Sequence, residues 1–429
     1  MFATVCSIHC CLLCSFPNPR PFCLFSPSLS FYLLFSFFFL SLFYQILGWQ
    51  SYPATPTITF RLCISPVLSP CSYLMAVPMS TESGRLPAIE EDWFKLVQEH
   101  GLKKKTVHSP DIMQTGSKIT VQQFLVLRSL WPKRKGIDEI RLPEVHYSKA
   151  KDRLRDYGRF EAYLSQIENK RSDQELAEWE GLGEFAPVRD WQLDIERTDE
   201  DDESSKILTL NHGSTESELS WEDSKEEFSF EASNPERVIR VALITYLKVI
   251  QIFNPDTQIN WIVAGNIFTT KFDSAYMVAR TDGHLCSRDS KEVLAITNTK
   301  PRVRDRADPS AYMQESALMA GWILHDEEHS REVPLSSRLL VSQNRNEIFL
   351  TFASYSPEYV KYLMMKDHSK GPGLLKYFKQ NRSKDPGFLT MQEYGPWDIY
   401  NHVHMRHLSK VLMAFNLEAT AMINESARE

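Results

Sequence analysis

The most informative stretch of the chain, called the decisive stretch below, reads Val293-Leu294-Ala295-Ile296-Thr297-Asn298-Thr299-Lys300. Its apolar start and its β-branched residues predict a largely buried β-strand. Because side chains alternate between the two faces of a strand, residues 298 and 300 are expected on one face. An Asp-Gly pair, Asp282 and Gly283, ends the strand-like run before it. The two runs predict an acidic group and a lysine at one sheet edge, which is the combination that metal-assisted hydrolysis of a phosphodiester requires.

Helix-like and strand-like patterns surround this stretch. A helix is predicted to begin at Pro235, with Asn234 as its N-cap, and to stop at Asn254-Pro255. A second helix is predicted over residues 312–324, and further helices over 357–365 and 404–417. Strands are predicted over residues 260–264, 275–281, 293–299, 338–341 and 347–353. This order predicts an α/β domain over residues 233–420, in which helices flank a mixed sheet.

The part of the chain before this domain has a different composition. Residues 79–193 are predicted to be mainly helical, with helices over 89–100, 121–131 and 149–180. Residues 194–232 are rich in acidic residues and serine, and the run 199–203 consists of five acidic residues. We expect this segment to be a disordered acidic linker, because like charges repel and apolar residues are too few to form a core.

The net charge also changes along the chain. Residues 82–231 carry 22 Lys and Arg against 33 Asp and Glu, a net charge of −11. Residues 232–429 carry 24 against 22, a net charge of +2, and two arginines before residue 82 complete the total of −7. The predicted α/β domain is therefore nearly neutral, so the acidity of the whole chain says nothing about its partners.

Residues 1–78 form an apolar leader. Within it, residues 29–49 carry no charge and are long enough to span a bilayer. The leader is also rich in residue types with pyrimidine-rich codons, as expected of an untranslated region read from a wrong start site. This spurious leader is favoured over a membrane anchor or a targeting peptide. We therefore expect an intracellular protein, in the nucleus or the cytoplasm, with membrane anchoring through residues 29–49 as the alternative.

Cysteine usage agrees with an intracellular location. Seven of the eight cysteines lie in the leader, and only Cys286 lies in the rest of the chain. A single cysteine cannot form a disulfide framework, so this part of the chain is expected in a reducing compartment.

Five segments carry a family resemblance: residues 280–283, 295–300, 313–323, 347–351 and 393–397, in this order. Together they resemble the fungal branch of the PD-(D/E)xK nuclease-like superfamily, and the match runs through nearly all of residues 235–418. The resemblance implies a restriction-endonuclease-like fold.

The resemblance also implies a set of site residues. Asp282 and the residue at position 298 would hold Mg²⁺ or Mn²⁺, and Lys300 would position the attacking water. Gln314 would support the site, with Glu315 as a further metal ligand. The family has a carboxylate where this chain has Asn298, and an amide oxygen brings no charge, so metal affinity is expected to fall. The expected cofactor is Mg²⁺ or Mn²⁺ if the protein is active, and none otherwise.

Three arginines alternate after the decisive strand, at Arg302, Arg304 and Arg306. An extended backbone would place them on one side, in line with Lys300, as a track for the phosphates of a nucleic acid. The alternative is a solvated loop with scattered arginines, because acidic residues interrupt the run.

A second metal motif is present in the chain. Residues 325–329 read His-Asp-Glu-Glu-His, which matches the H-x-x-E-H pattern of some zinc enzymes. No third ligand follows in the sequence, so a polar helix end is the favoured interpretation.

These patterns predict a nuclease-like protein with a degenerate site, which would hydrolyse nucleic-acid phosphodiesters with a divalent metal if active. The alternative is a non-catalytic module that binds nucleic acid or protein on the same fold. The expected partners are DNA or RNA at the site, and proteins through the helical and acidic regions.

Overall fold

A computed structural model of the chain describes residues 86–109, 112–113, 119–169, 181–209, 235–254, 258–272, 276–329, 338–364 and 387–426. All of them belong to the unit Pro78–Glu429. The apolar leader, including residues 29–49, lies outside the described residues, as does the stretch 210–232 of the predicted linker. Within the described part, no helix combines the length and the apolarity that crossing a bilayer would take.

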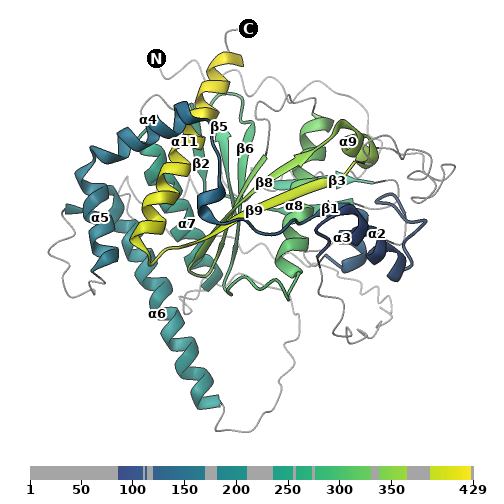
Figure 1. The fold of residues 1–429 in the computed structure, drawn as a ribbon, viewed down its shortest axis with the longest axis horizontal. Coiled ribbons are helices and arrows are strands. Elements are labelled where there is room, and N and C mark those ends of the chain that lie inside the picture. Colours follow the sequence, from purple (N-terminus) through teal and green to yellow (C-terminus); the bar gives the residue numbers. More distant parts are fainter. Residues whose placement is uncertain are drawn as a thin grey trace, which may run out of the picture. The chain divides into compact units, whose positions relative to one another are not determined.

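The centre of the described fold is a mixed sheet of seven strands with helices on both faces (Figure 1). The order of the strands is β1-β9-β8-β7-β6-β5-β2. Two neighbouring pairs, β6 with β7 and β1 with β9, are parallel, and the other pairs are antiparallel. The predicted α/β class is therefore confirmed. The strands are β1 (Ser129–Leu130), β2 (Ile259–Ile262), β5 (Gly283–Ser287), β6 (Val293–Lys300), β7 (Arg338–Asn344), β8 (Glu347–Tyr355) and β9 (Leu389–Asp398).

The decisive stretch forms β6, which lies between β5 and β7. All of its residues except Lys300 are buried, as expected of a strand that is covered on both faces. The register and pairing directions mean that β1, β6, β7 and β9 run the same way. We call the side on which these four strands end the carboxyl edge of the sheet.

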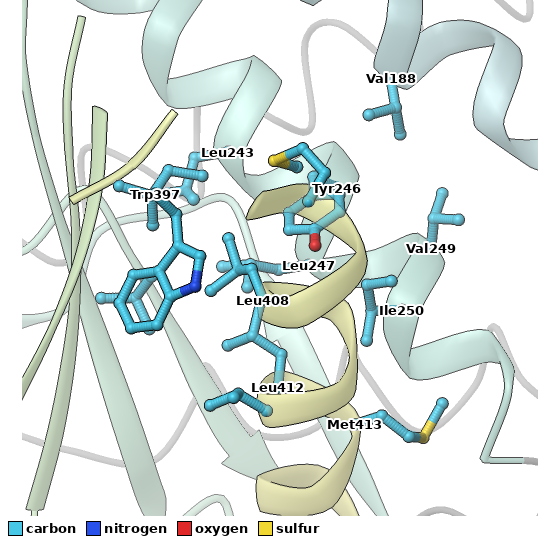
Figure 2. Packing of buried hydrophobic residues seen from close by; sticks show 14 of the residues in the cluster. Val188, Leu243, Tyr246, Leu247, Val249, Ile250, Trp397, Leu408, Leu412 and Met413 are labelled. Atoms are coloured by element: carbon cyan, nitrogen blue, oxygen red, sulfur yellow. The ribbon is translucent and has the colours of Figure 1, made fainter. Parts of the chain in front are cut away.

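One face of the sheet is covered by α7 (Pro235–Ile252) and α11 (His402–Ser426). Figure 2 shows Leu243 and Leu247 of α7 close to Leu408 and Leu412 of α11, with Trp397 of β9 beside them. Each of these side chains is buried, and burial stabilises the fold by about 1.5–3 kcal/mol for a side chain of this size. The apolar stripe on α7 therefore fixes the helix against the sheet.

Three further helices extend this first face. They are α4 (Glu144–Arg155), α5 (Gly158–Glu168) and α6 (Ala186–Thr209). Their buried side chains belong to the same apolar cluster as those of α7 and α11. Residues from the predicted N-terminal helical region thus share a core with the α/β domain.

The opposite face is covered by α8 (Ser310–Glu328), which is buried along most of its length. Three shorter helices share its apolar cluster: α2 (Glu90–Glu99), α3 (Val121–Val126) and α9 (Pro357–Met364). A separate two-stranded ribbon, β3 (Ile267–Lys271) with β4 (Tyr276–Arg280), packs on the outer side of α8. The two faces therefore have separate cores, one around α7 and one around α8.

Two of the predicted helices are shorter than expected. The predicted helix 149–180 overlaps two helices, α4 and α5, which are separated at Asp156 and Tyr157. The break occurs next to Gly158, a poor helix former. The predicted helix 121–131 ends at Val126, because Arg128 has a φ of 54° and the chain then enters β1.

The predicted linker also differs from the structure at its start. Residues 194–209 continue helix α6 and are not irregular. Ile195 is 1% exposed and packs in the first core, while Arg197 and Asp194 form an ion pair one turn apart. Packing and this local pair favour the helix over the coil that the acidic composition predicts.

Three strands of the seven-stranded sheet were not predicted, nor was β3 of the ribbon. The short β1 falls within the predicted helix 121–131. The strand β5 was missed because Asp282 and Gly283 were expected to end a strand, whereas the backbone continues into the sheet from Gly283. The third is β9, which contains Gly395 and Pro396, residues that normally argue against a strand. The pairing of β9 with β8 shifts register between Ile348 and Leu350, opposite this dipeptide, so the proline lies at an irregularity in the ladder.

Gly283 is required by close packing. A Cβ atom at this position would lie 2.6 Å from Ile244 Cδ1 of α7 and 2.7 Å from the carbonyl oxygen of Ile262. The second contact is with the backbone of the paired strand β2, which cannot turn aside as the tip of a side chain can. A side chain at position 283 would therefore push β5 and β2 apart.

We predict that Gly283→Ala lowers the free energy of unfolding by about 1–3 kcal/mol, because the added methyl overpacks this contact. Urea denaturation followed by circular dichroism measures the change. Gly158→Ala is the matched control, because a Cβ there meets nothing within 4 Å. Equal stability of the two variants would contradict the close packing.

Candidate site at the carboxyl edge of the sheet

Asp282 lies directly before β5 and beside the end of β6. Its Oδ2 atom accepts hydrogen bonds from Thr299 N at 2.6 Å and from Thr299 Oγ1 at 2.8 Å. Its Oδ1 atom forms an ion pair with Arg240 Nη2 of α7 at 2.5 Å. Both oxygens of this nearly buried carboxylate are thus engaged by partners from β6 and α7.

Lys300 lies at the last position of β6, at the same edge. Its Nζ atom is 3.7 Å from Glu236 Oε1 of α7. Glu236 and Arg240 are four residues apart on α7 and so share one face of the helix. Asp282 and Lys300 therefore converge on the first turns of the same helix, and each pairs there with a side chain of opposite charge.

Asn298 faces the other side of the sheet. The side chain of its neighbour Thr299 contacts Asp282 on the α7 face, and neighbouring strand residues point to opposite faces. Asn298 Nδ2 accordingly donates to Glu315 Oε1 of α8 at 3.3 Å. The two residues expected to share a metal, Asp282 and Asn298, therefore lie on opposite faces of the sheet.

Under α8, Arg304 lies at the centre of a fully buried charge network. Its Nη1 atom is 2.6 Å from Glu393 Oε1 of β9, and its Nη2 atom contacts Glu315 Oε1 of α8. The side chains of Arg304, Glu315 and Glu393 are all 0% exposed. Asn344 Oδ1 accepts from Arg304 Nε at 3.1 Å, and Ser342 Oγ donates to Glu315 Oε1 at 2.7 Å.

A second arginine completes the network. Arg134, which follows β1, donates from Nε to Glu393 Oε2 at 2.6 Å and from Nη2 to Tyr312 Oη at 3.0 Å. Two arginines thus balance two carboxylates. Burial alone would lower the pKa of the Arg304 guanidinium, but the charges of Glu315 and Glu393 outweigh it and raise that pKa above its ordinary value. Arg304 is therefore permanently charged.

The donor set at this edge does not fit Mg²⁺ or Mn²⁺. These hard cations need several oxygen ligands that converge on one point. The Asp282 carboxylate faces α7 and is held by Arg240 and Thr299, whereas Asn298 and Glu315 face α8 and surround the Arg304 guanidinium. A guanidinium, rather than a space, lies between the buried carboxylates.

The other predicted residues lie elsewhere. Gln314 lines a cavity beside β4, away from the network. His325 and His329 lie at the end of α8, where His329 Nδ1 is 2.6 Å from the carbonyl oxygen of His325. Within the residues that the structure describes, no group of three or more His, Cys, Asp or Glu side chains is arranged to hold a metal ion.

The three alternating arginines point in different directions. Arg302 and Arg306 are exposed, whereas Arg304 between them is buried. Arg304 is thus an internal residue, and the prediction of three arginines on one side is wrong for it. The reason is that Glu315 would be buried without a counter-ion if Arg304 faced the solvent, and Glu393 would keep only Arg134.

Other cations gather around this loop. Arg306 Nη2 donates to Pro132 O at 2.9 Å, which joins the loop to the segment after β1. Arg345 N donates to Lys300 O at 2.9 Å, which joins it to the turn after β7. We call the resulting surface the basic edge. It consists of Lys133, Lys135, Lys300, Arg302, Arg306 and Arg345, all exposed or half-buried.

Comparison with known proteins adds no relative. No family model, no curated protein and no solved structure matches the chain.

Several residues that build the site were not identified from the sequence. Arg240 pairs with Asp282 through a helix whose apolar stripe gave no sign of a role for its charged side. Arg134 reaches Glu393 over 259 residues of chain. The basic run 133–135 was visible in the sequence, but its place beside residue 304 depends on the parallel pairing of β1 with β9.

We predict that Arg304→Met lowers the free energy of unfolding by about 3–5 kcal/mol, because it leaves two buried carboxylates without their central cation. Chemical denaturation measures this change. Arg302→Met, two residues away and exposed, is the control and should change stability by about 0.5 kcal/mol or less. Similar effects of the two substitutions would show that Arg304 is not the central counter-ion.

Proposed function

We propose that this protein is a non-catalytic module on a PD-(D/E)xK nuclease-like scaffold, and that it binds nucleic acid through the basic edge. The main support for the non-catalytic assignment is that Asp282 and Asn298 lie on opposite faces of the sheet. A site that cuts a phosphodiester with a metal needs both groups on one ion.

The arrangement of the core elements supports the nuclease-like scaffold. In chain order, α7 is followed by β2, by the inserted ribbon of β3 and β4, and by β5 and β6, and the neighbours β2, β5 and β6 pair antiparallel. They are followed by α8 and by β7, which is parallel to β6. Asp282 lies directly before β5, and the Asn-x-Lys segment ends the adjacent strand β6, so both lie at one edge of the sheet. The restriction-endonuclease-like fold is thus part of the proposal, and element order is its support.

The charges around Asp282 and Asn298 support the loss of cutting. Arg240 neutralises Asp282, and Arg304 neutralises Glu315, so each carboxylate that could ligate a metal already has a cation as its partner. A metal would have to displace a guanidinium in each case, and the displaced charge would be left in a largely buried site.

The basic edge supports binding. Its cations come from three loops that hydrogen bonds hold together, so their spacing is fixed by the fold. Lys133 and Arg302 form no ion pair within the described residues and can therefore approach phosphates without first breaking one. Loops at the carboxyl ends of strands are also the common ligand position in α/β sheets.

We predict salt-dependent binding of nucleic acid by the purified protein, measured by fluorescence anisotropy with labelled single- and double-stranded DNA and RNA. Lys133→Gln and Arg302→Gln should each reduce the slope of log K against log salt by about 1, because each removes one phosphate contact. Arg155→Gln, an exposed arginine on α4, is the control and should leave the slope unchanged.

The same protein with Mn²⁺ should leave all four nucleic acids uncut. Asn298→Glu should not create cleavage, because the new carboxylate would face Glu315 and not Asp282. Cleavage by the wild type that is lost in Asp282→Ala would refute the non-catalytic assignment. Absence of salt-dependent binding, or equal binding by the Arg302 and Arg155 variants, would refute the role of the basic edge.

A further inference from the structure

The ribbon of β3 and β4 has one buried and one exposed face. Phe268, Met277 and Ala279 face α8, where Gly321 permits a close approach: a Cβ on this glycine would lie 3.3 Å from Phe268 Cβ. On the other face, Ile267 and Tyr276 are 45% and 51% exposed. The ribbon is thus firmly anchored through one face only.

The outer edge of β4 carries backbone groups without a strand partner in the described part of the chain. There, β4 pairs with β3 and with no other strand. Thr281 N donates to Asn266 O, on the β3 side, and backbone groups alternate in direction along a strand. The N–H and C=O groups of Val278 and Arg280 therefore point away from β3, toward an edge to which another strand can add.

A cavity of about 340 Å³ lies along this edge. Four consecutive residues of β4, from Met277 to Arg280, line it together with residues of α8 and with Met113, Ile119 and Gln123. Ala317 and Leu318 make the α8 wall apolar, and Gln314 adds an amide. The side chain that the sequence suggested as a catalytic support thus lines a groove between a strand edge and a helix.

We propose that this groove binds an extended peptide of a partner protein, which adds to β4 as a third strand. Val278 and Arg280 would supply alternating backbone hydrogen bonds, and every second side chain of the peptide would enter the apolar cavity. Arg280 is exposed at the end of β4 and forms no ion pair within the described residues, so it selects a peptide with a carboxylate at that end.

A peptide fits this surface better than a nucleic acid does. The groove offers unpaired amides and carbonyls in strand geometry, together with an apolar floor, and both match an extended backbone with alternating apolar side chains. Only Lys271 and Arg280 add positive charge to the ribbon, far less than the basic edge carries. The inference is therefore independent of the proposed nucleic-acid binding.

Selection of random peptides displayed on phage against the full chain tests this proposal. We expect the selected peptides to have apolar residues at alternate positions and an Asp or Glu at one end. Binding of a synthetic copy of a selected peptide should slow hydrogen exchange at the amides of Val278 and Arg280 and leave exchange at the amide of Ala279 unchanged. Failure to enrich any peptide, or protection at other amides only, would overturn the proposal.

Substitutions in β4 distinguish the contribution of its backbone groups to peptide binding from the contribution of its side chains. Val278→Pro removes only the outward N–H, which an edge strand tolerates, and should weaken the peptide by about tenfold. Val278→Ala keeps that N–H and should bind as the wild type does. Arg302→Gln should also leave peptide binding unchanged, since it alters the basic edge alone. Thermal denaturation checks that both Val278 variants are folded. Equal peptide affinities of the two folded variants would refute strand addition. Displacement of the peptide by single-stranded DNA would also overturn the proposal, because it would favour a nucleic acid in the groove.

Discussion

The ion pairs of Arg304 with Glu315 and Glu393 constrain the whole carboxyl edge. They join the loop after β6, the helix α8 and the strand β9 in a region from which water is excluded. Charges buried in this way are tolerated only with their partners in place. Arg304 points inward, whereas Arg302 and Arg306 in the same loop are exposed, so the loop that is anchored in the interior also carries part of the basic edge.

This constraint also gives a physical reason for the absence of metal binding that we propose. An ordinary metal-dependent nuclease needs its acidic groups to be neutralised by the ion that they bind. In this protein, arginines neutralise them instead: Arg240 on the α7 face and Arg304 on the α8 face. Asn298 fits the surroundings on the α8 face, because its amide can donate to Glu315. A glutamate at position 298 would add a third carboxylate to the charge network there.

The sequence predicted the elements that have strong local signals. The apolar stripe of α7, the buried run of β6 and the apolar α8 were identified with small errors at their ends. It did not predict β9, whose Gly395 and Pro396 are tolerated only at an irregular pairing, or the inward turn of Arg304. Those features depend on contacts between residues far apart in the chain, such as Arg304 with Glu393, 89 residues away.

The candidate site could be predicted only in part, because it too depends on contacts between residues far apart in the chain. Alternation along a strand correctly separates the faces of residues 298 and 299, but it cannot say on which face residue 282, from another strand, will lie. That choice is made by the pairing of Asp282 N with Thr297 O and by the position of Arg240 on α7. Alternation would place Lys300 on the same face as Asn298, but Lys300 lies at the strand end and its side chain instead reaches Glu236 of α7.

A crystal structure of the protein soaked in MnCl₂, with anomalous scattering recorded for manganese, would show whether Asp282 and Asn298 can share a metal ion. We expect no anomalous peak between Asp282 and Asn298, and we expect Arg304 to remain hydrogen-bonded to Glu315 and Glu393. A manganese ion ligated by both Asp282 and Asn298 would contradict this expectation.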